Sequence, residues 1–248
     1  MTAPLFSLFK QWLKQHGISL VLFDFDDTLI KTHDVFSTQI QLVYDYLEQI
    51  LKIERDEIDQ AFQQFNREAF EKHSVIPFDR WQYVILQLQE KYQFSDEVRD
   101  HCLGLLMEIY DILPEIFDGV IELLAGLKAE SIPVALITHA NEKWTNNKLD
   151  GLHLRRFFDA IHIVDERGKK TADSWRQAIA EHGVEPQQVL GIGDNVKGDI
   201  IAARQAGVQK LVWFNRGIGW SVYLEGELPE GVIEINAIDA LIPNVLAA

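Results

Sequence analysis

The sequence has one cysteine, Cys102, and no long apolar run. One cysteine excludes an intrachain disulfide, and no CxxC or HExxH spacing offers a zinc site. No apolar stretch approaches the roughly 18 residues of a membrane span, and no repeat or low-complexity tract is present. These absences predict a cytoplasmic globular protein that folds around its own hydrophobic core.

Positive charge is also scarce. The chain has 23 Lys and Arg against 38 Asp and Glu, a formal net charge of -15, which disfavours nucleic acid as a partner. The apolar residues of segment 5–13 have helical spacing, interrupted by Lys10. We expect this helix to pack on the core, with a membrane-surface or partner-binding helix as the alternative. A phosphorylated ligand would need local cations, backbone N–H groups or a bound metal.

Short continuous apolar runs recur along the chain. They lie at residues 18–23, 133–137, 160–164, 189–192 and 210–214. Such runs are typical of strands buried on both faces of a parallel sheet. Helical patterns lie between most of them, for example at residues 120–128 and 174–182. The alternation predicts an α/β fold with a doubly wound parallel sheet.

The connection between the first two runs is roughly a hundred residues long, far beyond an ordinary crossover. It contains four amphipathic helical patterns, which begin near Phe36, Ile58, Trp81 and Val98. These predict a four-helix domain over residues 33–113, inserted into a core made of residues 1–32 and 114–248. The insert begins at the carboxyl end of the first strand, where ligands bind in open α/β sheets. We therefore expect it to cover the site and exclude water.

Polar residues of particular kinds follow the apolar runs. They are Asp24, Asp26 and Asp27 after the first run, Thr138 at the second, Lys169 and Lys170 after the third, and Asp194 and Asp199 after the fourth. Three acids within four residues at the end of a buried strand are costly unless a cation or a catalytic task compensates. Carboxylate oxygens suit Mg²⁺, and a lysine and a hydroxyl suit phosphate. The set indicates phosphoryl transfer.

In order and separation, these motifs resemble those of the haloacid dehalogenase superfamily. Its first motif, D-x-D-x-T-L, matches residues 24–29, and its second, an apolar strand ending in Ser or Thr, matches residues 134–138. Its third, a lysine, matches Lys169, and its fourth, G-D-x-x-x-x-D, matches residues 193–199. The resemblance implies a Rossmann-like core and identifies the helical insert as a cap domain.

The resemblance implies catalytic roles for two aspartates. Asp24 would be the nucleophile that forms an aspartyl-phosphate, and also a Mg²⁺ ligand. Asp26 would be the general acid for the leaving group and then the base that activates water. Its backbone carbonyl is implied as a further metal ligand.

The remaining motif residues are implied to hold phosphate and metal. Thr138 would hold the phosphoryl oxygens, and Lys169 would pair with the nucleophile and the phosphoryl group. Asp194 would bind Mg²⁺, and Asp199 would support that site or orient the lysine. Many relatives have G-K-P-x-P at the third motif, where this chain has Lys169 followed by Lys170. Lys170 is therefore an alternative for the motif lysine.

The expected function is hydrolysis of a small-molecule phosphate monoester. Asp26 supplies the second acid and base that a monoester needs, which disfavours a dehalogenating or phosphonate-cleaving relative. A sugar-phosphate mutase and a non-catalytic phosphometabolite-binding protein are the alternatives. The substrate and the oligomeric state stay open. Candidates for specificity are His33, Phe36, Arg67, Lys72, Arg80 and Trp81. The alternative is that the aromatic residues fill the core of the insert and the basic ones lie in water.

Overall fold

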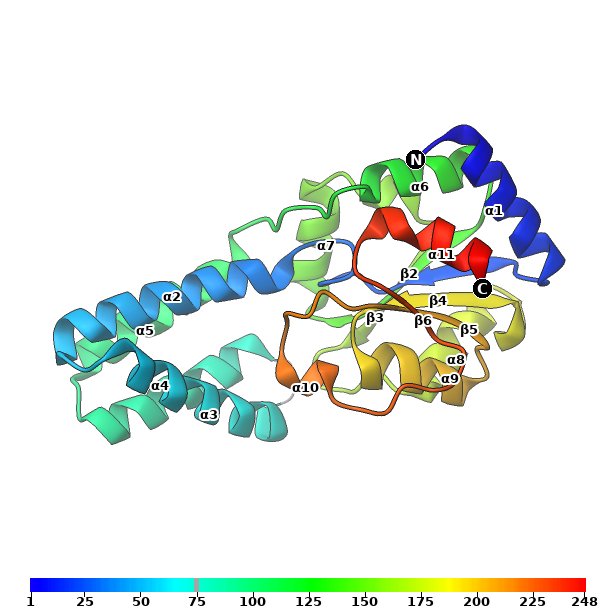
Figure 1. Cartoon of the computed structure of the whole chain (residues 1–248). Helices are drawn as coiled ribbons and strands as arrows, with labels where there is room; N and C mark the ends of the chain where they lie inside the picture. The colour runs from blue at the N-terminus through cyan, green and yellow to red at the C-terminus, as the bar shows by residue number, and fades with distance from the viewer. Residues whose placement is uncertain (74–75) are drawn as a thin grey trace. The chain divides into compact units, whose positions relative to one another are not determined.

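The computed structural model describes residues 1–73 and 76–248, and the chain divides into two compact units (Figure 1). Unit 1 comprises Met1–Lys31, Glu115–Val164 and Lys169–Ala248, and unit 2 comprises Thr32–Pro114 and Asp165–Gly168. The predicted insert, residues 33–113, includes residues 74 and 75, which lie outside the described residues.

Unit 1 is built on a six-stranded sheet with the order β3-β2-β1-β4-β5-β6. The strands are β1 (Leu20–Phe23), β2 (Val134–Ala140), β3 (Ala160–Asp165), β4 (Val189–Gly193), β5 (Lys210–Phe214) and β6 (Ile233–Ile235). β1 pairs in parallel with β2 and β4, β4 with β5, and β5 with β6. The chain fills one side of β1 and then the other, so the predicted doubly wound α/β class is confirmed. The sequence did not indicate β6, because three residues are too short a run for periodicity to show.

The strand register brings three polar segments to one edge of the sheet. Phe23, the last residue of β1, lies opposite Leu136 of β2 and Ile192 of β4. Asp24 follows Phe23 directly, and Thr138 and Asp194 each lie two residues beyond the partners of Phe23. The parallel pairing alone therefore gathers these side chains at the carboxyl edge.

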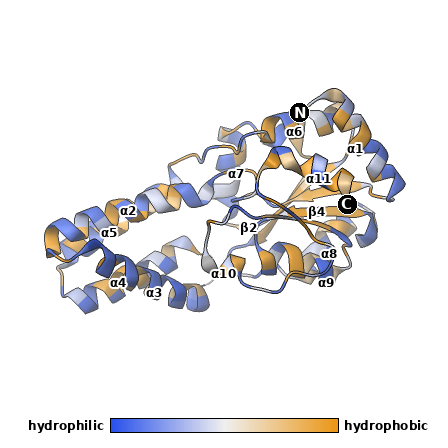
Figure 2. Cartoon of the chain, viewed as in Figure 1, coloured by the Kyte–Doolittle hydropathy of each residue, from blue (hydrophilic) through white to orange (hydrophobic). Residues whose placement is uncertain are grey.

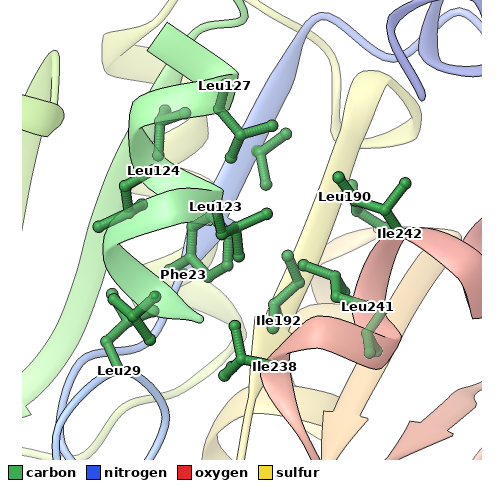
Figure 3. Packing of buried hydrophobic residues seen from close by; sticks show 14 of the residues in the cluster. Phe23, Leu29, Leu123, Leu124, Leu127, Leu190, Ile192, Ile238, Leu241 and Ile242 are labelled. Carbon is green, nitrogen blue, oxygen red and sulfur yellow. The ribbon is translucent and has the colours of Figure 1, made fainter. Parts of the chain in front are cut away.

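Three helices of unit 1 pack on one face of the sheet. They are α1 (Ala3–Gln15), α6 (Val120–Ala129) and α11 (Leu241–Ala247). Their apolar side chains join alternate strand residues, such as Phe23 and Ile192, in one buried cluster. Figure 3 shows Leu123 of α6 and Leu241 of α11 in this cluster. Phe9 of α1 is fully buried there, as the core-packing interpretation of the N-terminal segment predicts.

Two helices, α8 (Ala172–Glu181) and α9 (Ala202–Ala206), contribute to the core on the opposite face. Leu20 and Leu22 of β1 alternate with the residues of the first cluster and meet Trp175 of α8 in this second one. Both faces of the strands are thus buried, and Figure 2 shows the central strands as hydrophobic. Helix α7 (Glu142–Gly151) follows β2, and α10 (Ser221–Leu224) follows β5.

Unit 2 contains a helix for each of the four amphipathic patterns. They are α2 (Thr32–Leu51), α3 (Arg55–His73), α4 (Pro77–Tyr92) and α5 (Asp96–Met107), the last followed by a short 3₁₀ turn (Glu108–Tyr110). α2 and α4 each contact both α3 and α5. Helix α5 begins at an N-cap, Ser95, whose hydroxyl accepts from the Val98 N–H at 3.4 Å. Among the described residues, none of the helices combines the length and the apolar character needed to cross a membrane.

Candidate active site

Asp24 is buried at the carboxyl end of β1, with 6% of its surface exposed. Its backbone N–H donates to the Ile192 carbonyl at 2.8 Å, which continues the ladder with β4. Lys170 Nζ donates to Oδ1 at 2.8 Å, and Thr28 Oγ1 donates to Oδ2 at 3.2 Å. Both oxygens of this carboxylate therefore have a defined donor, one from its own loop and one from the segment before α8.

Lys170, the alternative to Lys169 for the motif lysine, is the one that lies at the Asp24 carboxylate. The Lys169 side chain is exposed, whereas Lys170 is buried. Lys170 Nζ also pairs with Asp199 Oδ1 and donates to the Ile137 carbonyl at 2.5 Å. One of these adjacent lysines is exposed and the other is buried, so only Lys170 reaches the sheet edge.

Asp194 and Asp199 complete a cluster of acids around Asp24. One carboxylate oxygen from each of the three lies within 4.8 Å of the others. Asp194 follows β4 as Asp24 follows β1, and the two strands are neighbours. Asp199 lies in a π-helical turn, η4 (Val196–Ile201), and its Oδ2 accepts from the Asn195 N–H at 3.0 Å. Such wide turns are frequent at functional sites.

Gly193 makes room for the Asp199 carboxylate. A Cβ added at Gly193 would lie 2.4 Å from the Asp199 carboxyl carbon, well inside van der Waals contact. The carboxylate therefore packs directly on the backbone where β4 ends. The fourth motif has glycine at this position because a side chain there would collide with the Asp199 carboxylate.

The cluster contains more acidic groups than basic ones. Burial raises the pKa of Asp24 to about 8, with Lys170 lowering it and Asp199 raising it. Burial also raises the pKa of Asp194, and the charges of Asp24 and Asp199 add to that shift. Burial alone would lower the pKa of Lys170, but Asp199 and Asp24 raise it. The three carboxylates offer hard oxygen ligands, and such a set suits a divalent cation such as Mg²⁺.

Asp26 lies in different surroundings and pairs with a lysine that the sequence analysis did not identify. Lys148 Nζ pairs with Asp26 Oδ1, and the Lys148 side chain is fully buried. Its ammonium lies 3.9 Å from the centroid of the Trp144 ring and 5.6 Å from that of Phe25. A signal for Lys148 existed, because it follows Trp144 by four residues on the apolar face of α7.

Thr138 lies within β2, since that strand continues to Ala140. Its side chain is buried, and the strand that carries it is the direct neighbour of β1. Asn141, three residues on, is the N-cap of α7, and its Oδ1 accepts from the Trp144 N–H at 3.0 Å. The role of Thr138 in holding phosphate stays a prediction.

The third acid of the loop, Asp27, shapes the backbone. Its φ is 60°, in the left-handed region that Asp tolerates better than most residues. Its N–H donates to the Ile30 carbonyl at 2.8 Å, and its carboxylate lies 3.9 Å from the Arg216 guanidinium. The loop therefore turns sharply after Asp26.

The aromatic residues proposed for specificity fill the core of unit 2. Phe36 and Trp81 are buried with ring centroids 5.8 Å apart. Arg80 is buried as well, with its guanidinium carbon 4.3 Å from the Trp81 ring centroid. Arg67 and Lys72 are exposed and His33 is half-buried. For Phe36 and Trp81, the core-filling alternative is thus confirmed.

Comparison with known proteins identifies the family. The model of the haloacid dehalogenase-like hydrolases matches residues 18–207, which include the cluster from Asp24 to Asp199. The chain belongs to this family. A solved hydrolase of the family from Xanthomonas campestris has a TM-score of 0.72 at 18% identity, covering 93% of this chain and 91% of its own. At 18% sequence identity, this structural similarity shows that the two proteins share a fold.

Curated relatives of this haloacid dehalogenase-like hydrolase are named as phosphatases. Phosphoglycolate phosphatase 1 of Pseudomonas aeruginosa is 32% identical over 120 residues, 46% of this chain and 44% of that enzyme. The glyceraldehyde 3-phosphate phosphatase of Pyrococcus furiosus is 25% identical over 203 residues, 81% of this chain and 82% of that enzyme. The chain thus spans less than half the length of the Pseudomonas enzyme that it matches.

Proposed function

We propose that this hydrolase is a Mg²⁺-dependent phosphatase for a small-molecule phosphate monoester, with Asp24 as nucleophile. The observation that carries the proposal is the Asp24 carboxylate, held by Thr28 and Lys170, with oxygens of Asp194 and Asp199 close by. An anchored carboxylate beside a lysine and a cation-binding donor set is what phosphoryl transfer to a side chain requires. The phosphatase names of the curated relatives support the same activity.

The first step transfers the phosphoryl group to the protein. A carboxylate oxygen of Asp24 forms a bond to phosphorus while the bond from phosphorus to the leaving oxygen breaks. Asp26 gives its proton to that leaving oxygen, so the product departs as a neutral alcohol. Lys170, paired with Asp24, offsets the repulsion between the Asp24 carboxylate and the anionic phosphoryl group. Bound Mg²⁺, held by Asp24, Asp194 and the Asp26 carbonyl, would offset repulsion between carboxylate and phosphate.

The second step returns Asp24 to its starting state. A water oxygen forms a bond to the phosphorus of the aspartyl-phosphate while the bond to the Asp24 oxygen breaks. Asp26, now a carboxylate, takes the proton of that water. The phosphate ion is released, and both aspartates are again as they were before the first step. Thr138, in the strand beside β1, would hold phosphoryl oxygens through both steps.

The names of the same relatives support a proposal for the substrate class. Both act on short phosphorylated compounds by their names, phosphoglycolate in one case and glyceraldehyde 3-phosphate in the other. We therefore propose short organic phosphate monoesters as the first substrates to examine. Sugar phosphates and nucleotides form the comparison set.

The test is release of inorganic phosphate by the purified chain. The panel holds phosphoglycolate, glyceraldehyde 3-phosphate, sugar phosphates, nucleotides and para-nitrophenyl phosphate, each assayed with Mg²⁺ and again with excess EDTA. We expect release with Mg²⁺ from at least one short ester and none with EDTA. Release that EDTA leaves unchanged would contradict the metal requirement. Binding of these esters without any release would support the non-catalytic alternative instead.

A further inference from the structure

Lys148 is a charged side chain with no exposed surface. It lies on α7 in the part of unit 1 that follows β2, and aromatic rings of Trp144 and Phe25 are its apolar neighbours. Lysine is almost never fully buried unless it is paired, because the ammonium loses its hydration. The carboxylate that pairs with Lys148 in the described part of the chain is that of Asp26.

The pair joins residues that are 122 positions apart. Asp26 comes from the loop after β1, and Lys148 comes from the helix after β2, the neighbouring strand. The Asp26 side chain is 22% exposed, whereas that of Lys148 is 0% exposed. One end of the pair therefore faces solvent while the other lies in the protein interior. Lys148 has no access to a substrate of its own and reaches the reaction only through Asp26.

A donor on one carboxyl oxygen decides which oxygen exchanges protons. Lys148 Nζ donates to Asp26 Oδ1, and an oxygen that accepts from an ammonium is poorly placed to carry the carboxyl proton itself. The same contact restricts rotation of the carboxyl plane. A general acid must present its proton within hydrogen-bond reach of the leaving oxygen, and geometry counts before acidity.

We propose that Lys148 is a positioning residue that makes Oδ2 of Asp26 the proton-exchanging oxygen, an inference that rests on the function proposed above. In the first step, the Oδ2–H bond breaks and the leaving oxygen gains that proton as its bond to phosphorus breaks. In the second step, Oδ2 gains the proton that the attacking water loses. Lys148 keeps its own protons and its contact with Oδ1 throughout.

A packing role for Lys148 makes a different prediction. Methionine has a similar length and suits the contacts with Trp144 and Phe25, so Lys148→Met removes the charge and the donor but keeps the apolar stem. If Lys148 only fills space, this variant lowers kcat/KM by the same factor for every substrate, because less of the protein is folded. If Lys148 positions a general acid, the loss depends on how much the leaving group needs a proton.

The experiment compares phenyl phosphate, para-nitrophenyl phosphate and dinitrophenyl phosphate, which are all aryl phosphate esters and differ in leaving-group basicity. The measured quantity is kcat/KM, which ends at the first irreversible step, the transfer to Asp24. We expect Lys148→Met to lower kcat/KM about 100-fold for phenyl phosphate and less than about 3-fold for dinitrophenyl phosphate. Lys143→Met, at an exposed lysine on the same helix, is the matched control and should change neither value.

A double-mutant cycle that combines Lys148→Met with Asp26→Asn measures the energetic coupling between these two residues. With the acid removed, Lys148→Met should alter the rate on phenyl phosphate by less than about 2-fold. Two results would overturn the positioning role and leave the proposed function standing. One is that Lys148→Met lowers kcat/KM equally for all three phosphates, and the other is that it still lowers kcat/KM by the full factor in the Asp26→Asn variant. No phosphate release by the wild type from any aryl or short alkyl ester would overturn both.

Discussion

Asp24 and Asp26 are two residues apart, yet the regions around them differ in electrostatic character. Asp24 lies in a buried cluster in which Asp194 and Asp199 bring the count to three carboxylates around Lys170. That region has three acidic groups for one basic group, and a divalent cation is the natural complement.

Asp26 pairs with a lysine of its own. One carboxylate meets one buried ammonium, that of Lys148, among aromatic rings. One loop can thus hold two aspartates in different surroundings, because each aspartate meets a lysine from a different neighbouring element.

Asp24→Asn should abolish turnover, with a loss of at least about a thousandfold, because the amide cannot act as the nucleophile. The measurements are phosphate release and trapping of an acid-labile phosphoenzyme. Asp26→Asn should also be slow, but should still form the phosphoenzyme from dinitrophenyl phosphate. Asp56→Asn, at an exposed position in α3, is the control. Phosphoenzyme formed by Asp24→Asn would break the contrast between the two aspartates.

Lys170→Met should lower kcat about a hundredfold, since no cation would then stand between the nucleophile and Asp199. It should also lower the free energy of unfolding in EDTA by about 3 kcal/mol, the cost of leaving a buried charge without its partner. Lys169→Met is the matched variant one residue away and exposed, and should stay within about 0.5 kcal/mol of the wild type. Denaturant unfolding and steady-state kinetics check both. A larger effect at Lys169 would reverse the assignment of the motif lysine.

Gly193→Ala should displace the Asp199 carboxylate, because the new Cβ would lie 2.4 Å from its carboxyl carbon. We expect a loss of about 1–3 kcal/mol in stability from overpacking, and a kcat reduced about tenfold. Gly104→Ala is the control, since an added Cβ there meets nothing within 4 Å and lies in helix α5. That change should be neutral or stabilising by up to about 1 kcal/mol. Unchanged kinetics in Gly193→Ala would show that Asp199 tolerates another position.

Mg²⁺ should stabilise the protein more at about pH 8 than at about pH 5. The pKa of Asp24 is raised from 3.8 to about 8, so the folded chain holds a proton that the unfolded chain releases. The contribution of this carboxyl group to the free energy of unfolding is fully present below its ordinary pKa, and it is lost as the pH rises through about 8. A bound cation offsets that loss, with a shift of a few degrees in the unfolding midpoint. Thermal melts with and without Mg²⁺ measure it, and Asp194→Asn should diminish the shift.

Much of the fold was predictable because its signals are local. The apolar runs of β1 and β4 identify strands buried on both faces, and the stripes of α2 to α5 identify amphipathic helices. β6 was missed, since Ile233–Ile235 is an edge strand of three residues with no run to recognise.

The order of the chemical groups can be read along the chain: Asp24 and Asp26 follow the first strand, Thr138 lies in the second, and Asp194 and Asp199 follow the fourth. Their convergence follows from parallel strands that end at one edge, which a pattern of residues can predict. Which lysine meets which aspartate depends on the folded arrangement. The backbone direction before α8 selects Lys170 over Lys169, and the packing of α7 beside the β1 loop brings Lys148 to Asp26. Such pairings depend on side-chain direction and on contacts between distant segments, and neither leaves a periodic trace in the sequence.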